Sequence, residues 1–272
     1  MDDILNFNYY SMMIGFLIKK TFYDAWDNLF RIVLLNLGFV VSLVIPVVLP
    51  GIIPVTLLSI VVAAIGFLWC SVYLAAVALS VKAVSDYGSF GFTDFGRNLK
   101  AAWPAGVVMG LTGFLFFIVI KFTIPFYMEM DSLLGLLLGA VIFWTLLLTL
   151  VAFQFFFAIR ARLDVKPKKI IKKCFIIFFD NPLFSIFSLI YTIATLAISV
   201  VLAFLMPGPA GMLLFLDEGL RLRLLKYDWL DANPPSEGSS KRRAIPWDVL
   251  LIDEREKTGT RTIRNFIFPW KD

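Results

Sequence analysis

The sequence predicts an all-α, polytopic transmembrane helical bundle of about six spans, with five as the alternative. The chain is 60% hydrophobic and only 17% charged, whereas soluble domains average about 45–50% apolar and about 25% charged residues. Two long stretches, residues 32–81 and 181–216, contain no Asp, Glu, Lys or Arg. Basic residues gather at the ends of the apolar runs, as the positive-inside rule expects.

The first part of the chain, residues 1–28, is expected to be an interfacial amphipathic helix, because apolar positions alternate there with charged ones such as Lys19, Lys20 and Asp24. The transmembrane domain is expected over residues 29–228, and a linker with a cytoplasmic tail over residues 229–272.

The first two spans are predicted from the uncharged stretch 32–81. A single helix of that length would measure about 75 Å, against a bilayer core of about 30 Å. The prolines near its centre mark a turn, so the stretch predicts two spans at about 29–49 and 53–81.

The next two spans are predicted at about 104–125 and 133–159. Pro104 suits the first turn of a helix, and the turn between these spans carries Glu129 and Asp131. Residues 160–173 follow with one acidic and seven basic residues, and the lysines alternate with isoleucines as in a basic amphipathic helix. We expect this segment to contact anionic lipid headgroups or a protein partner, through Lys168, Lys169, Lys172 and Lys173.

The end of the membrane domain is less regular. A fifth span is predicted at about 183–206, and Pro207-Gly208-Pro209 ends it. A sixth span at about 210–225 is shorter than a bilayer requires, yet it would return the basic tail to the cytoplasm. The alternative is five spans and an external tail.

Three charged residues in this sixth span form the candidate intramembrane polar site: Asp217, Glu218 and Arg221. Asp217 would lie near mid-membrane, where charged groups are costly and often functional. Asp217 and Arg221 are four residues apart and could pair on one helix face. Both a site for an ion, proton or headgroup and a purely structural pair fit this pattern.

The tail holds candidate contacts for a partner. Trp247 lies on the apolar side of a short predicted helix, and the last residues are apolar and aromatic. Such a surface is expected to bind a partner, the membrane or the body of the protein. The residues singled out are Trp247, Phe266, Phe268 and Trp270.

The sequence lacks the residues or motifs typical of several kinds of chemistry. The chain contains no histidine, which removes the commonest general base and metal ligand. It has no phosphate-binding loop and no nucleophile elbow. We therefore expect no enzymatic activity, no catalytic residues, no metal and no cofactor. The net charge of +5 is explained by basic residues at the ends of the predicted spans, so no nucleic-acid binding is expected.

Three segments resemble the YesL-like family of bacterial integral membrane proteins, a domain of unknown function. They are LVIPVVLPGIIPVT, FGFTDFGRNLKAAWPAG and FAIRARLDVKPKKIIKKCFIIFFDNP, and the resemblance covers roughly residues 15–228. It implies an accessory role in carbohydrate uptake, and it supplies no functional residues.

The sequence thus predicts an accessory or assembly subunit of a bacterial inner-membrane complex linked to carbohydrate or other solute transport. It would bind a protein partner or a second copy of itself. The alternative is a transporter or channel in its own right, with its polar site around Asp217 and Arg221. Counts of Lys and Arg place the N-terminus, and the tail with it, in the cytoplasm.

Overall fold

The computed structural model describes residues 2–234, 245–259 and 261, and of residues 2–11 it describes the backbone alone. The described residues form helices and no strand, as predicted for an all-α protein. They divide into two compact units, a larger one of residues 30–217 and a smaller one of residues 1–29 with 218–272. The sequence suggested three consecutive parts, whereas the structure groups the two ends of the chain.

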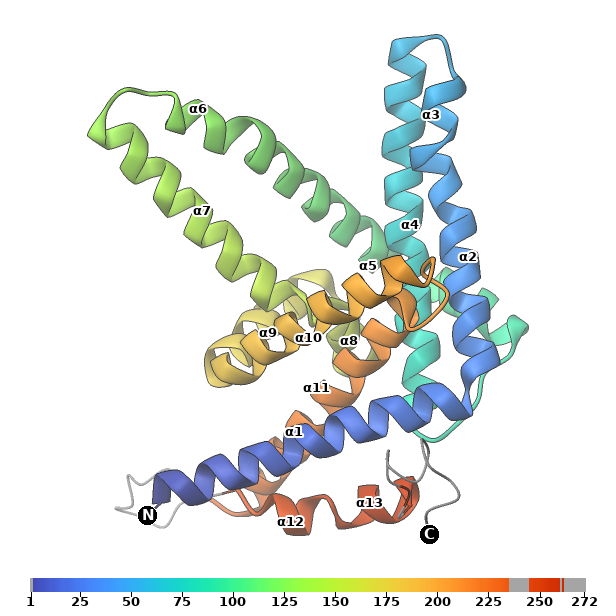
Figure 1. Ribbon diagram of the computed structural model, residues 1–272, viewed down its shortest axis with the longest axis vertical. Helices are drawn as coiled ribbons and strands as arrows, with labels where there is room; N and C mark the ends of the chain where they lie inside the picture. The colour runs from blue at the N-terminus through green and yellow to red at the C-terminus, as the bar shows by residue number, and fades with distance from the viewer. Residues whose placement is uncertain (1, 235–244, 260, 262–272) are drawn as a thin grey trace. The chain divides into compact units, whose positions relative to one another are not determined.

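A long hairpin opens the larger unit. Its helices are α2 (Leu29–Val47), α3 (Leu49–Ile52) and α4 (Thr56–Ser85), in agreement with the first two predicted spans (Figure 1). The two arms pack closely, because a Cβ atom on Gly66 would lie 2.6 Å from the backbone nitrogen of Pro46. Nearer the start of α2, the Tyr73 hydroxyl donates a hydrogen bond to the Leu35 carbonyl at 2.9 Å.

A second hairpin follows, built from α5 (Phe92–Ile118), the π-helical η1 (Val119–Thr123), α6 (Ile124–Met128) and α7 (Leu133–Phe153). The third span was predicted to begin at Pro104, but α5 begins twelve residues earlier. The Gly91 amide donates to the Asp94 carboxylate at 2.8 Å and caps the helix there. A Cβ on Gly106 would lie 2.4 Å from the Val72 Cα, so the glycine permits the close contact of α5 with α4.

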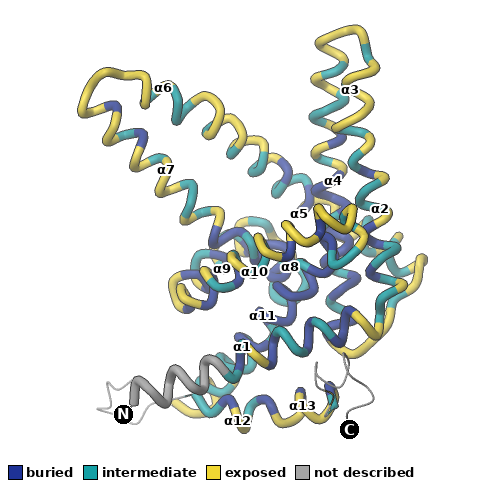
Figure 2. The backbone as a smooth tube through the Cα atoms, viewed as in Figure 1, coloured by how far each residue is buried: buried dark blue, intermediate teal, exposed yellow. Residues whose placement is uncertain are grey.

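The base of the larger unit holds α8 (Phe156–Arg162), α9 (Pro167–Asp180), α10 (Pro182–Val201) and the first part of α11 (Gly208–Ala232). Figure 2 shows buried residues gathered at this base and exposed residues along the far ends of both hairpins. In α4, most residues from Cys70 to Ser85 are buried, whereas most residues before Gly66 are at least partly exposed. The core of the unit therefore lies at one end of the hairpins.

Five stretches of helix in the described part of the chain are long and apolar enough to cross a membrane: Leu29–Ile52, Thr56–Ser85, Phe92–Met128, Leu133–Arg162 and Pro182–Val201. They correspond to the first five predicted spans. The predicted sixth span, 210–225, lies within α11 and is not among them. This segment carries Asp217, Glu218, Arg221 and Arg223, so the count of six spans stays a prediction.

The turn between α10 and α11 is held by Asn36, a buried amide in α2. Its Nδ2 donates to the carbonyls of Leu205 at 3.0 Å and Pro207 at 2.8 Å. Its Oδ1 accepts from the Ala210 amide at 2.9 Å. Gly208 has φ +60°, and a Cβ there would lie 2.3 Å from the Asn36 amide, so only glycine fits this position.

The smaller unit combines α1 (Asp2–Asp27), the second part of α11, α12 (Trp247–Leu250) and α13 (Ile252–Thr258). Helix α12 packs against α1. Arg261 donates to both carboxylate oxygens of Asp27 at 2.9 Å, and its guanidinium lies 4.7 Å from the ring centre of Tyr23. The described tail residues thus pack on the N-terminal helix.

Replacement of Asn36 by Leu removes three hydrogen bonds from the α10–α11 turn. At about 0.5–1.5 kcal/mol each, the free energy of unfolding is expected to fall by about 2–4 kcal/mol. Denaturant titration of the purified protein in detergent measures the change. The control is Thr145→Val, because the exposed Thr145 hydroxyl bonds only to a carbonyl of its own helix. A loss no larger than that of the control would contradict the role of Asn36.

Candidate functional site

Arg162, the last residue of α8, is the centre of an ion-pair cluster in which Asp217 is buried and Asp86 is exposed. Its Nε and Nη2 donate to the two carboxylate oxygens of Asp217 at 2.9 and 2.5 Å. Its Nη1 donates to Asp86 at 2.9 Å, and Nη2 also donates to the Ser85 hydroxyl at 2.8 Å. One guanidinium therefore joins the end of α4, the end of α8 and the middle of α11.

The geometry of this cluster is that of a structural clamp. All three guanidinium nitrogens of Arg162 donate, and both oxygens of Asp217 accept. Asp217 was expected near mid-membrane. The structure places it beside Ser85 and Asp86, where α4 ends, and its depth in a membrane stays a prediction.

A second buried cluster holds the smaller unit together. The Lys20 ammonium lies 2.5 Å from Asp24 and 3.7 Å from Glu218, and the Thr21 hydroxyl donates to Glu218. The side chains of Lys20 and Glu218 are fully buried. Within the described residues, Glu218 Oε1 accepts no hydrogen bond. These contacts join α1 to the beginning of the second part of α11.

Arg221 and Trp247 take part in further contacts within the smaller unit. Arg221 donates to Glu254 from Nε at 3.1 Å and from Nη2 at 2.6 Å. Arg223 lies 5.5 Å from the ring centre of Trp247, which is buried. The sequence suggested a pair of Asp217 and Arg221, whereas the structure pairs Asp217 with Arg162 and Arg221 with Glu254. Trp247, a candidate partner contact, serves to pack α12.

Most lysines of the basic helix α9 are exposed. Lys168, Lys169 and Lys172 are exposed, while Lys173 lies 3.4 Å from Asp164. Ile176 and Phe179 continue the exposed side at helical spacing. Cys174 faces the interior, and burial raises the pKa of its thiol to about 12, so it is a packing residue.

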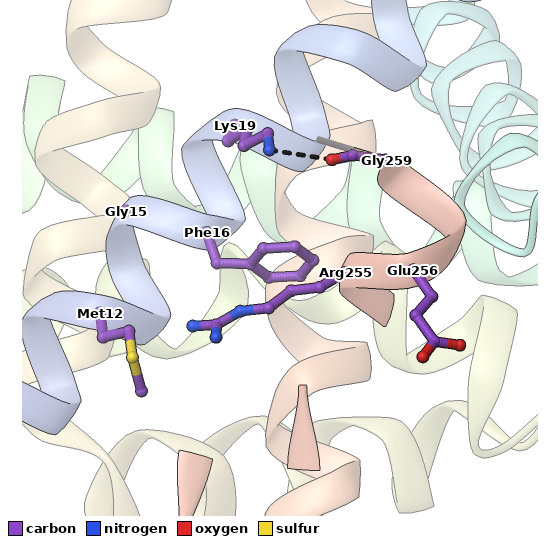
Figure 3. A pocket seen from close by; sticks show the side chains of 7 residues that line it. All are labelled: Met12, Gly15, Phe16, Lys19, Arg255, Glu256 and Gly259. Carbon is purple, nitrogen blue, oxygen red and sulfur yellow. Dashed lines mark hydrogen bonds between the residues drawn. The ribbon is translucent and has the colours of Figure 1, made fainter. Parts of the chain in front are cut away.

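A groove of about 530 Å³ lies between α1 and α13 in the smaller unit. Its lining residues are Met12, Gly15, Phe16, Lys19, Arg255, Glu256 and Gly259. Figure 3 shows the Arg255 side chain running beside the Phe16 ring toward Met12, with the Glu256 carboxylate directed away from them. At one end, Lys19 donates to the Gly259 carbonyl at 3.1 Å. Cationic and apolar side chains therefore share one concave surface.

Other expected contacts lie outside the described residues, namely those of Phe266, Phe268 and Trp270. Where the structure does describe the chain, it holds no group of three or more Cys, Asp or Glu residues arranged to hold a metal ion.

Sequence reasoning missed the partners of the candidate residues. Arg162 was counted with a basic loop, 55 positions from Asp217, and no local pattern connects the two. Lys20 and Asp24 were assigned to an interfacial helix, although their spacing of four indicates a pair. Asn36 could have been found, because an amide inside an uncharged span needs hydrogen-bond partners.

No family model matches this chain, and neither a curated protein nor a solved structure shows significant similarity to it. The resemblance to the YesL-like family therefore stays a prediction.

Substitution of Asp217 by Asn is expected to destabilise the protein, because Arg162 then loses its bidentate carboxylate while it stays buried. Breaking a buried pair costs about 3–5 kcal/mol. The midpoint of unfolding in detergent measures the loss. The matched control is Asp131→Asn, at an exposed position in the turn before α7. If Asp217→Asn proves as stable as that control, Asp217 is no structural clamp.

Proposed function

We propose that this chain is a non-enzymatic accessory or assembly subunit of a bacterial inner-membrane complex linked to carbohydrate or other solute transport. One observation carries the proposal. The hairpin of α5 and α7 leaves apolar side chains exposed on every side along its far portion, including Leu111, Phe114 and Phe117 on α5 and Val141, Trp144 and Leu148 on α7.

The two arms of this hairpin bury little of their surface against each other. They meet near the shared turn, where α6 packs on α7, and they diverge toward the base (Figure 1). Helices in a membrane associate through close van der Waals packing. Arms that pack little against their own chain have faces available for helices of another protein, and this supports a role in assembly.

The distribution of charge favours this role over transport. The ionisable side chains at the base, Arg162, Asp86 and Asp217, are engaged with one another. A transport site needs polar groups that a substrate or ion can reach. The absence of histidine from the sequence and of a metal-ligand cluster from the described residues supports a non-enzymatic function.

Photo-crosslinking tests the assembly role. p-Benzoylphenylalanine replaces Phe117 or Trp144 in the hairpin, with Leu57 on the exposed part of α4 as the control position. We expect both hairpin positions to crosslink to the same membrane protein, identified by mass spectrometry, at near-stoichiometric yield in native membranes. A crosslink to a second copy of this chain, or to lipid alone, would contradict an accessory role. Solute uptake by the pure protein in liposomes would favour a transporter.

The contacts within each unit also support a topology for the chain. In the smaller unit, Arg261 binds Asp27 and Glu218 binds Thr21, which supports placing the two segments that flank the larger unit on one side of the membrane. An even number of crossings follows. It is six if the first part of α11 crosses, or four if one of the five apolar helices does not cross.

We infer that α10 is this helix. Its start is fixed by Gln154, whose amide donates to the Ser185 carbonyl at 2.8 Å. Gln154 precedes Arg162 by eight residues, which corresponds to about 12 Å along a helix. The other end of α10 is tied to the start of α11, because the Gly208 amide donates to the Ser199 hydroxyl at 3.0 Å. Gly208 lies about 14 Å along α11 from Asp217.

Gln154 and Gly208, which contact the two ends of α10, each lie about 12–14 Å along the chain from the Arg162–Asp217 pair, which is less than half of a core of about 30 Å. We propose that α10 lies along the membrane and that the chain crosses it four times. Exposed lysines on α9, at Lys168, Lys169 and Lys172, support contact with anionic headgroups on the cytoplasmic side, where the positive-inside rule puts the base and both chain ends.

Labelling of single cysteines tests this topology. An impermeant maleimide is added to intact spheroplasts that carry Asp131→Cys, Leu202→Cys or Val165→Cys; the native cysteines are buried. We expect Asp131→Cys to react from outside, and Val165→Cys to react only after permeabilisation. Leu202→Cys, in the α10–α11 turn, should not react from outside. Its reaction from outside would show that α10 crosses the membrane and would overturn the proposal of four crossings.

A further inference from the structure

The groove between α1 and α13 combines two kinds of surface. Met12 and the face of Phe16 form an apolar side, and Lys19 and Arg255 contribute two cations. At Gly15 and Gly259, no described atom beyond the neighbouring backbone lies within 4 Å of the position that a Cβ would take. A bound molecule could therefore approach the backbone of both helices.

The two cations in the groove lack acidic partners. Among the described residues, the Arg255 guanidinium forms no ion pair or hydrogen bond, and the Lys19 ammonium is bound by the Gly259 carbonyl rather than by a carboxylate. Glu256 lines the groove, but its carboxylate is directed away from Arg255 in Figure 3. Nearby, Arg261 is already neutralised by Asp27. The groove thus carries uncompensated positive charge.

The pKa of Lys19 is consistent with the positive charge of the groove. Burial, followed by the positive charges of Arg261 and Arg255, lowers the pKa of the Lys19 ammonium. A bound anion would oppose all three effects, because an opposite charge nearby favours the protonated amine.

We propose that this groove is a binding site for a small anionic amphiphile, with a phosphate or carboxylate on Lys19 and Arg255 and an alkyl or aromatic portion on Met12 and Phe16. Arg255 suits such an anion because its guanidinium offers paired donors to a planar or tetrahedral oxyanion. The volume of about 530 Å³ falls within the range of small-molecule sites. Both membrane lipids and soluble organic phosphates offer this chemistry.

Hexyl phosphate is the probe, titrated calorimetrically into the full-length protein in uncharged detergent. Inorganic phosphate and hexyltrimethylammonium are the comparison ligands. We expect saturable binding of hexyl phosphate, at least tenfold weaker binding of inorganic phosphate, and no binding of the cation. Arg255→Ala should weaken hexyl phosphate about tenfold, which corresponds to one lost charged contact. Lys257→Ala, an exposed residue of α13 outside the groove, should bind like the wild type.

A second variant tests the apolar half of the site. Met12→Ser should weaken hexyl phosphate but leave inorganic phosphate unchanged. Equal affinity of wild type and Arg255→Ala for hexyl phosphate would overturn the proposal, and so would equal affinity of the wild type for hexyl phosphate and inorganic phosphate.

Native mass spectrometry separates the two sources of ligand. A phospholipid that co-purifies with the wild type and is lost from Arg255→Ala identifies a lipid site. Binding of hexyl phosphate with no such difference in co-purified lipid identifies a soluble ligand. Either result is independent of whether the α5–α7 hairpin binds a partner.

Discussion

The guanidinium of Arg162 is the contact on which the larger unit depends. The hairpins are joined by van der Waals packing along α4 and α5, yet the ends of α4 and α8 and the middle of α11 meet at one charged side chain. Four hydrogen bonds, three of them to carboxylates, fix the mutual register of helices that are far apart in the sequence. Packing among apolar side chains alone specifies such a register weakly, because one helix can slide along another at small cost. Separation of a buried ion pair leaves an uncompensated charge, so sliding of these helices would be costly.

Buried ion pairs also join the helices of the smaller unit. Lys20, Asp24 and Glu218 join the first helix of the chain to the second part of α11. The described tail is bound to the same helix through Lys19 and Arg261. Polar contacts within this unit therefore link segments that more than 190 residues separate, which makes the two ends of the chain one folded body.

The helices were predictable from the sequence to a large extent, whereas their partners were not. Uncharged stretches of the right length identify α2, α4, α7 and α10, because lipid imposes a strong constraint on composition. The start of α5 was missed, since Pro104 looked like a first-turn proline and the cap at Gly91 left no strong signal. Asp217 was singled out as part of a candidate intramembrane polar site. Its contacts depend on Arg162, and sequence spacing carries no information on such a distant contact. Trp247 shows the same limit, because an aromatic residue that packs under Arg223 has the same sequence signature as one that binds a partner.

The proposed position of α10 along the membrane has a consequence for the lipid around the protein. The hydroxyl side chains Ser185, Ser188 and Ser199 of this helix face the interior, and its exposed side carries Leu183, Ile190 and Ile193. A helix that lies along one leaflet, about 30 Å long and about 10 Å wide, occupies about 300 Å² of that leaflet and none of the other. The two leaflets then hold unequal amounts of protein. Membrane regions whose curvature matches this inequality would accommodate the chain with less deformation than a flat bilayer.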